Sequence, residues 1–212
     1  MSIRAAMLAL LEQGPMYGYQ LRAEFEQRTG ATWPLNVGQV YTTLSRLERD
    51  GLVEHVRGAG AEDDTDQADH TGQVMYRVTD SGRVEVSEWF TTPVPRTQPP
   101  RDELAIKLAI AVTLPDVDVA AMVQQQRVAT MAALQDYTRL KRTGRASRPD
   151  HPEDLAWSLV LDSLVFDAEA EIRWLDHCEA RLRRAALEGK LHTPARPTRP
   201  SMNATDEKEV RP

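Results

Sequence analysis

The chain has a single cysteine, Cys178, among its 212 residues, so no disulfide framework can form within it. It also lacks an apolar run that approaches the roughly 18 residues needed to span a membrane. The first apolar stretch is interrupted by Glu12 and Gly14, which does not fit a signal peptide. We therefore expect a cytoplasmic protein that has no membrane partner.

The sequence contains no recognisable catalytic constellation. No nucleophile, base and orienting acid stand in a known arrangement, and no phosphate-binding glycine loop is present. His177 and Cys178 are adjacent, but neighbours on a helix point about 100° apart. The acidic stretch that ends at His70 lacks calcium-loop spacing, which favours a solvated loop over a cation site. We expect no enzymatic activity, no catalytic residues, no metal site and no cofactor.

Positive charge is also scarce, because 26 Lys and Arg face 32 Asp and Glu, for a net charge of -6. A protein that binds nucleic acid neutralises phosphates with Lys and Arg. Any such surface in this chain must therefore keep the acids away from it. Residues 58–73 hold five of these acids and neither Lys nor Arg: Glu62, Asp63, Asp64, Asp66 and Asp69.

Residues 36–51 form the most informative stretch of the chain. Asn36 is a favourable N-cap, and Gly51 tolerates the left-handed conformation that ends many helices. An apolar stripe at helical spacing predicts one buried face; its members are Val37, Val40, Leu44 and Leu47. The opposite face is polar and rich in donors, and its acids come only at the end. Such a face suits the major groove of DNA, where helices read base edges with Gln, Thr, Ser and Arg.

Several residues are predicted to contact DNA. On the 36–51 helix they are Asn36, Gln39, Tyr41, Thr42, Ser45 and Arg46, with packing on the wing as the alternative for Tyr41. The N-terminus of the preceding helix can hold a phosphate, which adds Tyr17, Tyr19 and Gln20, with a core position as the alternative for Tyr19. Two β-rich segments, 52–57 and 74–79, predict a hairpin, and at its base Arg57 and Arg77 are candidate backbone contacts.

The order of elements predicts a mainly α protein with two domains. Residues 1–90 read as a winged helix-turn-helix of three helices plus a β-hairpin wing, closed by a further helix. Residues 91–100 hold four prolines and form the predicted linker. Residues 101–189 read as an all-α dimerisation domain, and residues 190–212 as a disordered tail.

The last long helix, from about 152 to 189, carries a heptad seam. Its predicted dimer contacts are Trp157, Leu161, Leu164, Leu175, Cys178 and Leu182, with packing within one subunit as the alternative. Glu171 is the one charged residue in this apolar seam. Three roles are open for it: pairing with an Arg across an interface, fixing the register of the helices, or facing a pocket. Trp157, Glu171 and Trp174 are candidates for binding an aromatic effector, with core packing as the alternative for the two tryptophans.

Three motifs resemble the PadR family of transcriptional regulators. They are the turn Gly14-Pro15-Met16-Tyr17-Gly18-Tyr19, the helix pattern Gly38-x-x-Tyr41-x-x-Leu44-x-x-Leu47-x-x-x-Gly51-Leu52, and the strand Tyr76-Arg77-Val78-Thr79-x-x-Gly82. The resemblance implies a homodimeric regulator, usually a repressor, that responds to small aromatic or drug-like effectors. Thr42 stands where the family often has Pro, and the wing is longer and more acidic than usual.

These observations predict a sequence-specific DNA-binding regulator that acts as a homodimer on a palindromic operator. The alternative is a winged-helix protein that uses its acidic wing to bind a protein partner instead of DNA.

Overall fold

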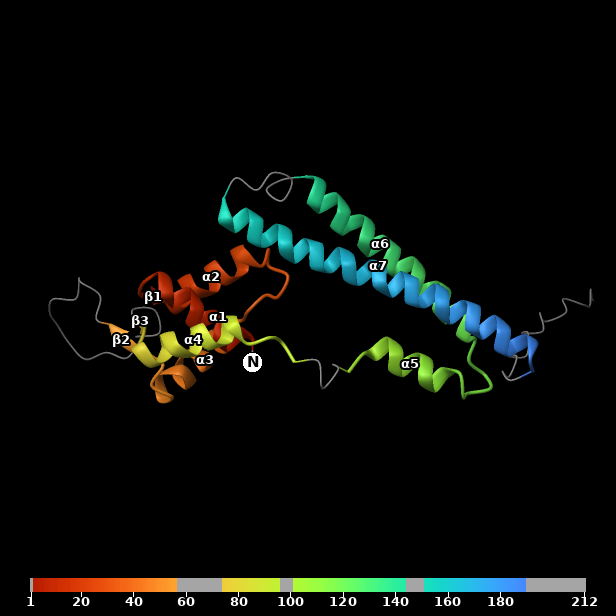
Figure 1. The fold of residues 1–212 in the computed structure, drawn as a ribbon, viewed down its shortest axis with the longest axis horizontal. Helices are drawn as coiled ribbons and strands as arrows, with labels where there is room; N and C mark the ends of the chain where they lie inside the picture. The colour runs from red at the N-terminus through yellow and green to blue at the C-terminus, as the bar shows by residue number, and fades with distance from the viewer. Residues whose placement is uncertain (1, 57–73, 96–100, 144–150, 190–212) are drawn as a thin grey trace, which may run out of the picture. The chain divides into compact units, whose positions relative to one another are not determined.

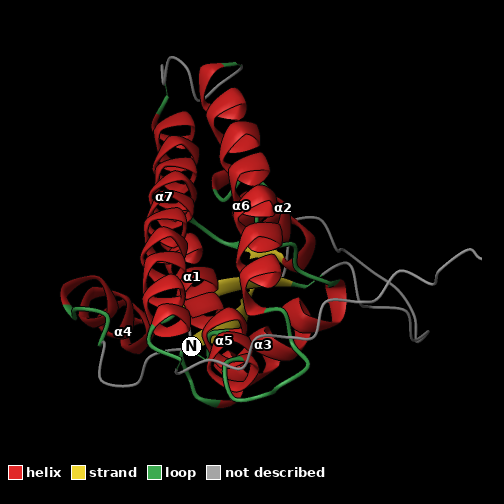
Figure 2. Ribbon diagram, turned by 90° about the vertical axis from the view of Figure 1, so that its right-hand side faces the viewer, coloured by secondary structure: helices red, strands yellow, loops and turns green. Residues whose placement is uncertain are grey.

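The computed structural model describes residues 2–56, 74–95, 101–143 and 151–189. In chain order its elements are α1 (Ser2–Leu10), the 3-10 turn η1 (Leu11–Gln13), β1 (Met16–Tyr17), α2 (Gly18–Arg28), α3 (Val37–Arg49), β2 (Val53–Val56), β3 (Met75–Val78), α4 (Asp80–Thr91), α5 (Glu103–Ala111), α6 (Val119–Arg142) and α7 (Pro152–Leu187). The fold is mainly helical, as the sequence predicts, with one small sheet (Figures 1 and 2).

The first three helices pack around one apolar core. Each contributes residues at helical spacing that are almost fully enclosed: Met7 and Leu8 from α1, Leu21 and Phe25 from α2, and Val40, Leu44 and Leu47 from α3. Burying such side chains removes apolar surface from water and stabilises the arrangement by about 1.5–3 kcal/mol for each large residue. Helices α2 and α3 thereby form the predicted helix-turn-helix.

The sheet has three strands, in the order β1-β3-β2, whereas the sequence predicts only the hairpin of β2 and β3. Both pairings are antiparallel; Val53 lies opposite Val78, and Met16 lies opposite Tyr76. Strand β1 is two residues long, and its segment is too short to show the alternation by which strands are recognised. Through this pairing, β1 connects the turn before α2 with the wing strand β3.

Helix α4 lies against the hairpin through Gly82. The α4 N-cap is Thr79, whose hydroxyl accepts a hydrogen bond from the Gly82 N–H and donates one to the Gly51 carbonyl. A Cβ atom at position 82 would lie 2.3 Å from the Leu52 carbonyl oxygen. Only glycine permits this approach of backbone to backbone.

Helices α5, α6 and α7 account for the remaining described structure. Side-chain caps begin α5 and α6, because Asp102 accepts from the Ala105 N–H at 3.1 Å and Asp118 from the Ala121 N–H at 2.9 Å. Helices α6 and α7 lie side by side and antiparallel (Figures 1 and 2).

The described residues form two compact units. One contains the described residues within 1–99 and 132–169, and the other contains those within 100–131 and 170–189. The second unit has its own small core, in which Leu108, Val123 and Leu175 are buried together. The domain limits drawn from the sequence stay a prediction.

Candidate DNA-binding interface

The start of α3 is organised by a reciprocal cap. The Gln39 N–H donates to the Asn36 side-chain oxygen at 2.7 Å, and the Asn36 N–H donates to the Gln39 side-chain oxygen at 3.2 Å. This capping box satisfies two backbone donors that a helix end otherwise leaves open. Asn36 therefore caps α3, as the sequence predicts. The side-chain oxygen of Gln39 is occupied in this capping box, whereas its amide NH2 group can still donate to another partner.

The outward face of α3 is polar and exposed. Thr42, Ser45 and Arg46 are all exposed, while Val40, Leu44 and Leu47 on the opposite side are at most 1% exposed. A hollow of about 430 Å³ runs along this face; it is lined by Ile3, Asn36, Gly38, Gln39, Thr42, Thr43 and Arg46. The buried side anchors the helix, so the polar side is presented in a fixed orientation.

Tyr41 packs against α2 at Gly18, and it also lies near enough to Tyr76 of the wing strand β3 to interact with it electrostatically, so packing on the wing stays an open alternative for Tyr41. Its side chain is half-buried beside the main core. A Cβ atom at Gly18 would lie 2.9 Å from two carbons of the Tyr41 ring. The absence of a side chain at Gly18 thus makes room for the ring where α2 begins.

At the start of α2, the three predicted contacts differ in their surroundings. Tyr19 is 59% exposed, which excludes the core alternative, and its ring stacks on that of Tyr17 with centroids 5.6 Å apart. The Gln20 side-chain oxygen accepts a hydrogen bond from the Tyr17 N–H at 2.9 Å. Tyr19 is therefore the side chain most available to a partner, whereas Gln20 helps to form the helix end.

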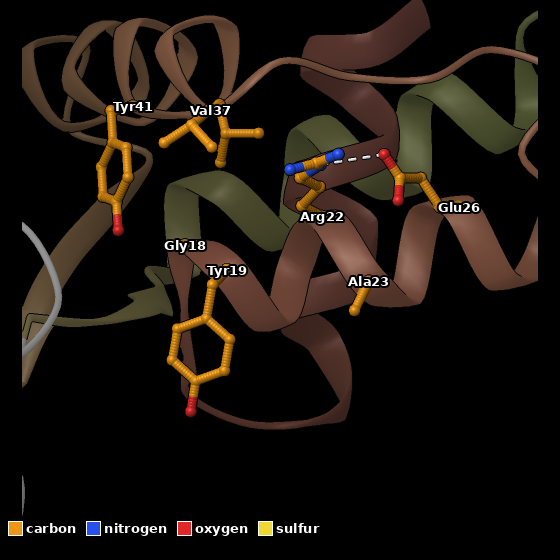
Figure 3. A pocket seen from close by; sticks show the side chains of 8 residues that line it. Gly18, Tyr19, Arg22, Ala23, Glu26, Val37 and Tyr41 are labelled. Carbon is orange, nitrogen blue, oxygen red and sulfur yellow. Dashed lines mark hydrogen bonds and ion pairs between the residues drawn. The ribbon is translucent and has the colours of Figure 1, made fainter.

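A second hollow, of about 320 Å³, lies between α2 and α3 (Figure 3). Its lining residues are Gly18, Tyr19, Arg22, Ala23, Glu26, Val37, Val40 and Tyr41. Arg22 donates from Nε to the Glu26 carboxylate at 2.9 Å. The sequence interpretation did not single out Arg22, and its position one helical turn after Gly18 is the signal that would have found it.

The wing residues are only partly described. Arg77 is exposed and donates to the Glu54 carboxylate of the neighbouring strand at 2.6 and 2.9 Å, so its charge is compensated in the free protein. Arg57 and the acidic residues of 62–69 lie outside the described residues, as does His70. Within the hairpin, burial raises the pKa of the Tyr76 hydroxyl, and the nearby Glu48 carboxylate adds to this effect.

The apolar side chains of the predicted heptad seam of α7 are largely covered by other residues of the same chain. Leu161 and Leu175 are 0% exposed, so neither retains surface for a partner subunit, and both are corrected as dimer contacts. Cys178 and Leu182 are partly buried against the core that contains Leu175. Burial also raises the pKa of the Cys178 thiol. Leu164 is half-buried.

The three effector candidates do not share one environment. Glu171 accepts hydrogen bonds from the side chains of Thr130 and Gln126 on α6, which favours the register alternative. Trp174 packs on the Leu108–Val123–Leu175 core. The Trp157 ring lies so close to Gly30 that a Cβ atom there would come within 2.2 Å of it. Trp157 and Glu171 are 14 residues apart, roughly 21 Å along a helix.

A different face of α7 is apolar and exposed. Leu155, Leu159 and Phe166 lie on one stripe and are 49%, 60% and 65% exposed. Their spacing of four and seven residues places them on one side of a helix. The sequence interpretation passed over this stripe because the longer seam beside it has more members.

Two negative findings concern the described residues. They contain no group of three or more His, Cys, Asp or Glu arranged to hold a metal ion. None of their helices has the length and the apolar composition to cross a membrane.

The three-helix core, the polar face of α3 and the antiparallel strands beside it define a winged helix-turn-helix protein. Residues 7–88 match the transcriptional regulator PadR-like family, and residues 100–183 match the virulence activator alpha C-terminal family. The chain belongs to the PadR-like family and is a transcriptional regulator. This family consists of regulators and not of enzymes.

Relatives and solved structures agree with this assignment. The negative transcriptional regulator PadR of Bacillus subtilis is 24% identical over 178 residues, which is 82% of this chain and 93% of the relative. A probable transcriptional regulator of Mycobacterium tuberculosis is 29% identical over 182 residues, 81% of this chain and 92% of the relative. The structure of Bacillus subtilis PadR with operator DNA has 25% identity and a TM-score of 0.60, covering 85% of this chain and 99% of that one.

Proposed function

We propose that this protein is a homodimeric repressor that places α3 in the major groove of a palindromic operator. The exposed polar face formed by Thr42, Ser45 and Arg46 carries this proposal, because its orientation is set by the fully buried opposite face. Bacillus subtilis PadR, which is named a negative regulator, has been solved with operator DNA. Residues 1–90 would be the DNA-binding part, and residues 101–189 the dimerisation and effector part.

We assign the dimer contact to the exposed apolar stripe of α7, which is called the outer stripe below and is formed by Leu155, Leu159 and Phe166. Leu155, Leu159 and Phe166 expose apolar surface that water disfavours, and a second copy of the same helix would cover it. A two-fold dimer would hold two α3 helices about one DNA turn apart, on the order of 34–36 Å. This spacing is the reason for expecting a palindromic operator.

An aromatic effector would release the repressor from DNA. The support is that Bacillus subtilis PadR has been solved with p-coumaric acid. Trp157 remains the candidate contact in this chain, since its ring lies against Gly30 directly after α2. A change at this ring would reach the segment that joins α2 to α3.

Selection from a random-sequence duplex library tests the proposal. The purified protein should enrich a palindromic sequence and bind it more tightly than a scrambled duplex. Failure to enrich any sequence would contradict sequence-specific binding. Titration of the complex with p-coumarate then tests the effector step by fluorescence anisotropy, and unchanged binding at saturating concentration would exclude that compound.

A further inference from the structure

We infer that Arg22 binds a backbone phosphate of the operator in the hollow between α2 and α3, and that Glu26 orients it. This inference rests on the proposed function, because it assumes that the winged helix-turn-helix binds DNA. It adds a contact that no motif in the sequence indicates.

One hydrogen bond holds the Arg22 side chain, and its guanidinium keeps further donors for a ligand. Its Nε donates to Glu26 at 2.9 Å, and among the described residues neither terminal Nη nitrogen has an acceptor. Its side chain is 39% exposed, and that of Glu26 is 25% exposed. Figure 3 shows the guanidinium between Val37 and Glu26, at the hollow between the two helices. A guanidinium with two free nitrogens matches the geometry of a phosphate group.

Glu26 is a positioning residue because it also holds the start of α3. The same carboxylate oxygen that accepts from Arg22 accepts from the Leu35 N–H at 3.3 Å. Leu35 directly precedes the N-cap Asn36. One carboxylate therefore fixes the direction of the guanidinium and its distance from the helix that reads the bases.

The surroundings of Arg22 favour an anion of the DNA backbone over a base edge. In a helix-turn-helix the first helix crosses the backbone while the second enters the groove. Arg22 lies on the first of these helices and faces the exposed Val37 at the beginning of the second. Tyr19, on the same hollow, adds a hydroxyl that donates to phosphate.

The test measures salt dependence with Arg22→Ala, Arg22→Lys and a matched control. Arg28→Ala removes the same charge from the same helix, at a residue paired with Glu24 that does not line the hollow. The DNA probes are a duplex selected by the wild-type protein and a scrambled duplex of equal length. Circular dichroism verifies that every variant is folded.

We expect Arg22→Ala to weaken both duplexes by the same factor, about tenfold for each lost charged hydrogen bond and so about a hundredfold in a dimer. The slope of log K against log salt should fall by about 0.9 for each phosphate contact, so by about two units in a dimer. Arg22→Lys should retain the slope, and Arg28→Ala should leave both quantities unchanged.

Wild-type affinity and slope in folded Arg22→Ala would overturn the inference, as would a loss confined to the selected duplex, which would indicate base reading. An equal loss of affinity in Arg28→Ala would also overturn it, because the loss would then come from the change in net charge and not from a contact of Arg22. If the wild-type protein shows no salt-dependent affinity for either duplex, the proposed function itself has failed.

Discussion

Replacing Gly18 with alanine should disturb α3 through Tyr41, which is itself a candidate DNA contact. The new Cβ would lie 2.9 Å from Tyr41 Cε1 and Cζ and 3.2 Å from the Tyr41 hydroxyl oxygen. Ordinary contacts between carbon atoms lie near 3.5–4.0 Å, so the ring must move by roughly 0.5–1 Å. Overpacking of this kind costs about 1–3 kcal/mol.

Thermal and urea denaturation measure this cost. For a chain of this size, 1–3 kcal/mol corresponds to a decrease in Tm of roughly 2–12 °C. Tyr41 lies on α3 between the buried Val40 and the exposed Thr42. Its displacement should therefore weaken binding to a selected duplex more than binding to a scrambled one.

A double-mutant cycle isolates the contact between the two positions. Tyr41→Leu removes the ring atoms that the new Cβ would meet, so Gly18→Ala should cost little in that background. The expected coupling is about 1–3 kcal/mol, in the range found for residues in direct contact. Equal costs of Gly18→Ala in the two backgrounds would refute the reasoning.

Three further substitutions have expected outcomes. Gly82→Ala should destabilise by about 1–3 kcal/mol in urea denaturation, because its Cβ would meet the Leu52 carbonyl oxygen at 2.3 Å; wild-type stability would be inconsistent with this packing. Leu159→Asp should yield a folded monomer by sedimentation, and a folded Leu159→Asp dimer would show that the outer stripe is not the interface. Leu175→Asp should instead unfold, because it buries an unpaired charge. Glu171→Ala should cost about 1–3 kcal/mol in thermal denaturation through its lost hydrogen bonds, and Glu171→Gln less, so equal costs would contradict the role assigned to them.

Much of the recognition helix could be predicted from the sequence. Asn36 caps the helix, and the apolar stripe from Val40 to Leu47 forms its buried face. These features depend on local chemistry and on helical spacing, and both are visible in a linear sequence. Val37 was the exception: it was assigned to the stripe but is 54% exposed, since it lies in the first turn beyond the core.

Features that depend on tertiary contacts were not predictable in the same way. Spacing identified the α7 seam but not its partner, and the structure buries Leu161 and Leu175 within the chain. Gln39 is a different case, because the capping box that uses its side-chain oxygen is a local pattern over three residues and could have been found in the sequence. Strand β1 pairs with a segment about 60 residues away, and no local pattern announces such pairing.

The most direct test of the central claim compares the sequences selected by the wild-type protein and by Arg46→Ala. If α3 lies in the major groove, Arg46 contacts a base or phosphate in each half-site, and a bidentate base contact contributes about 1–3 kcal/mol of discrimination. We predict that the variant loses base preference at symmetric positions in both half-sites and keeps the rest of the palindrome. Unchanged base preference and affinity at every position in Arg46→Ala would contradict the placement of α3 in the groove.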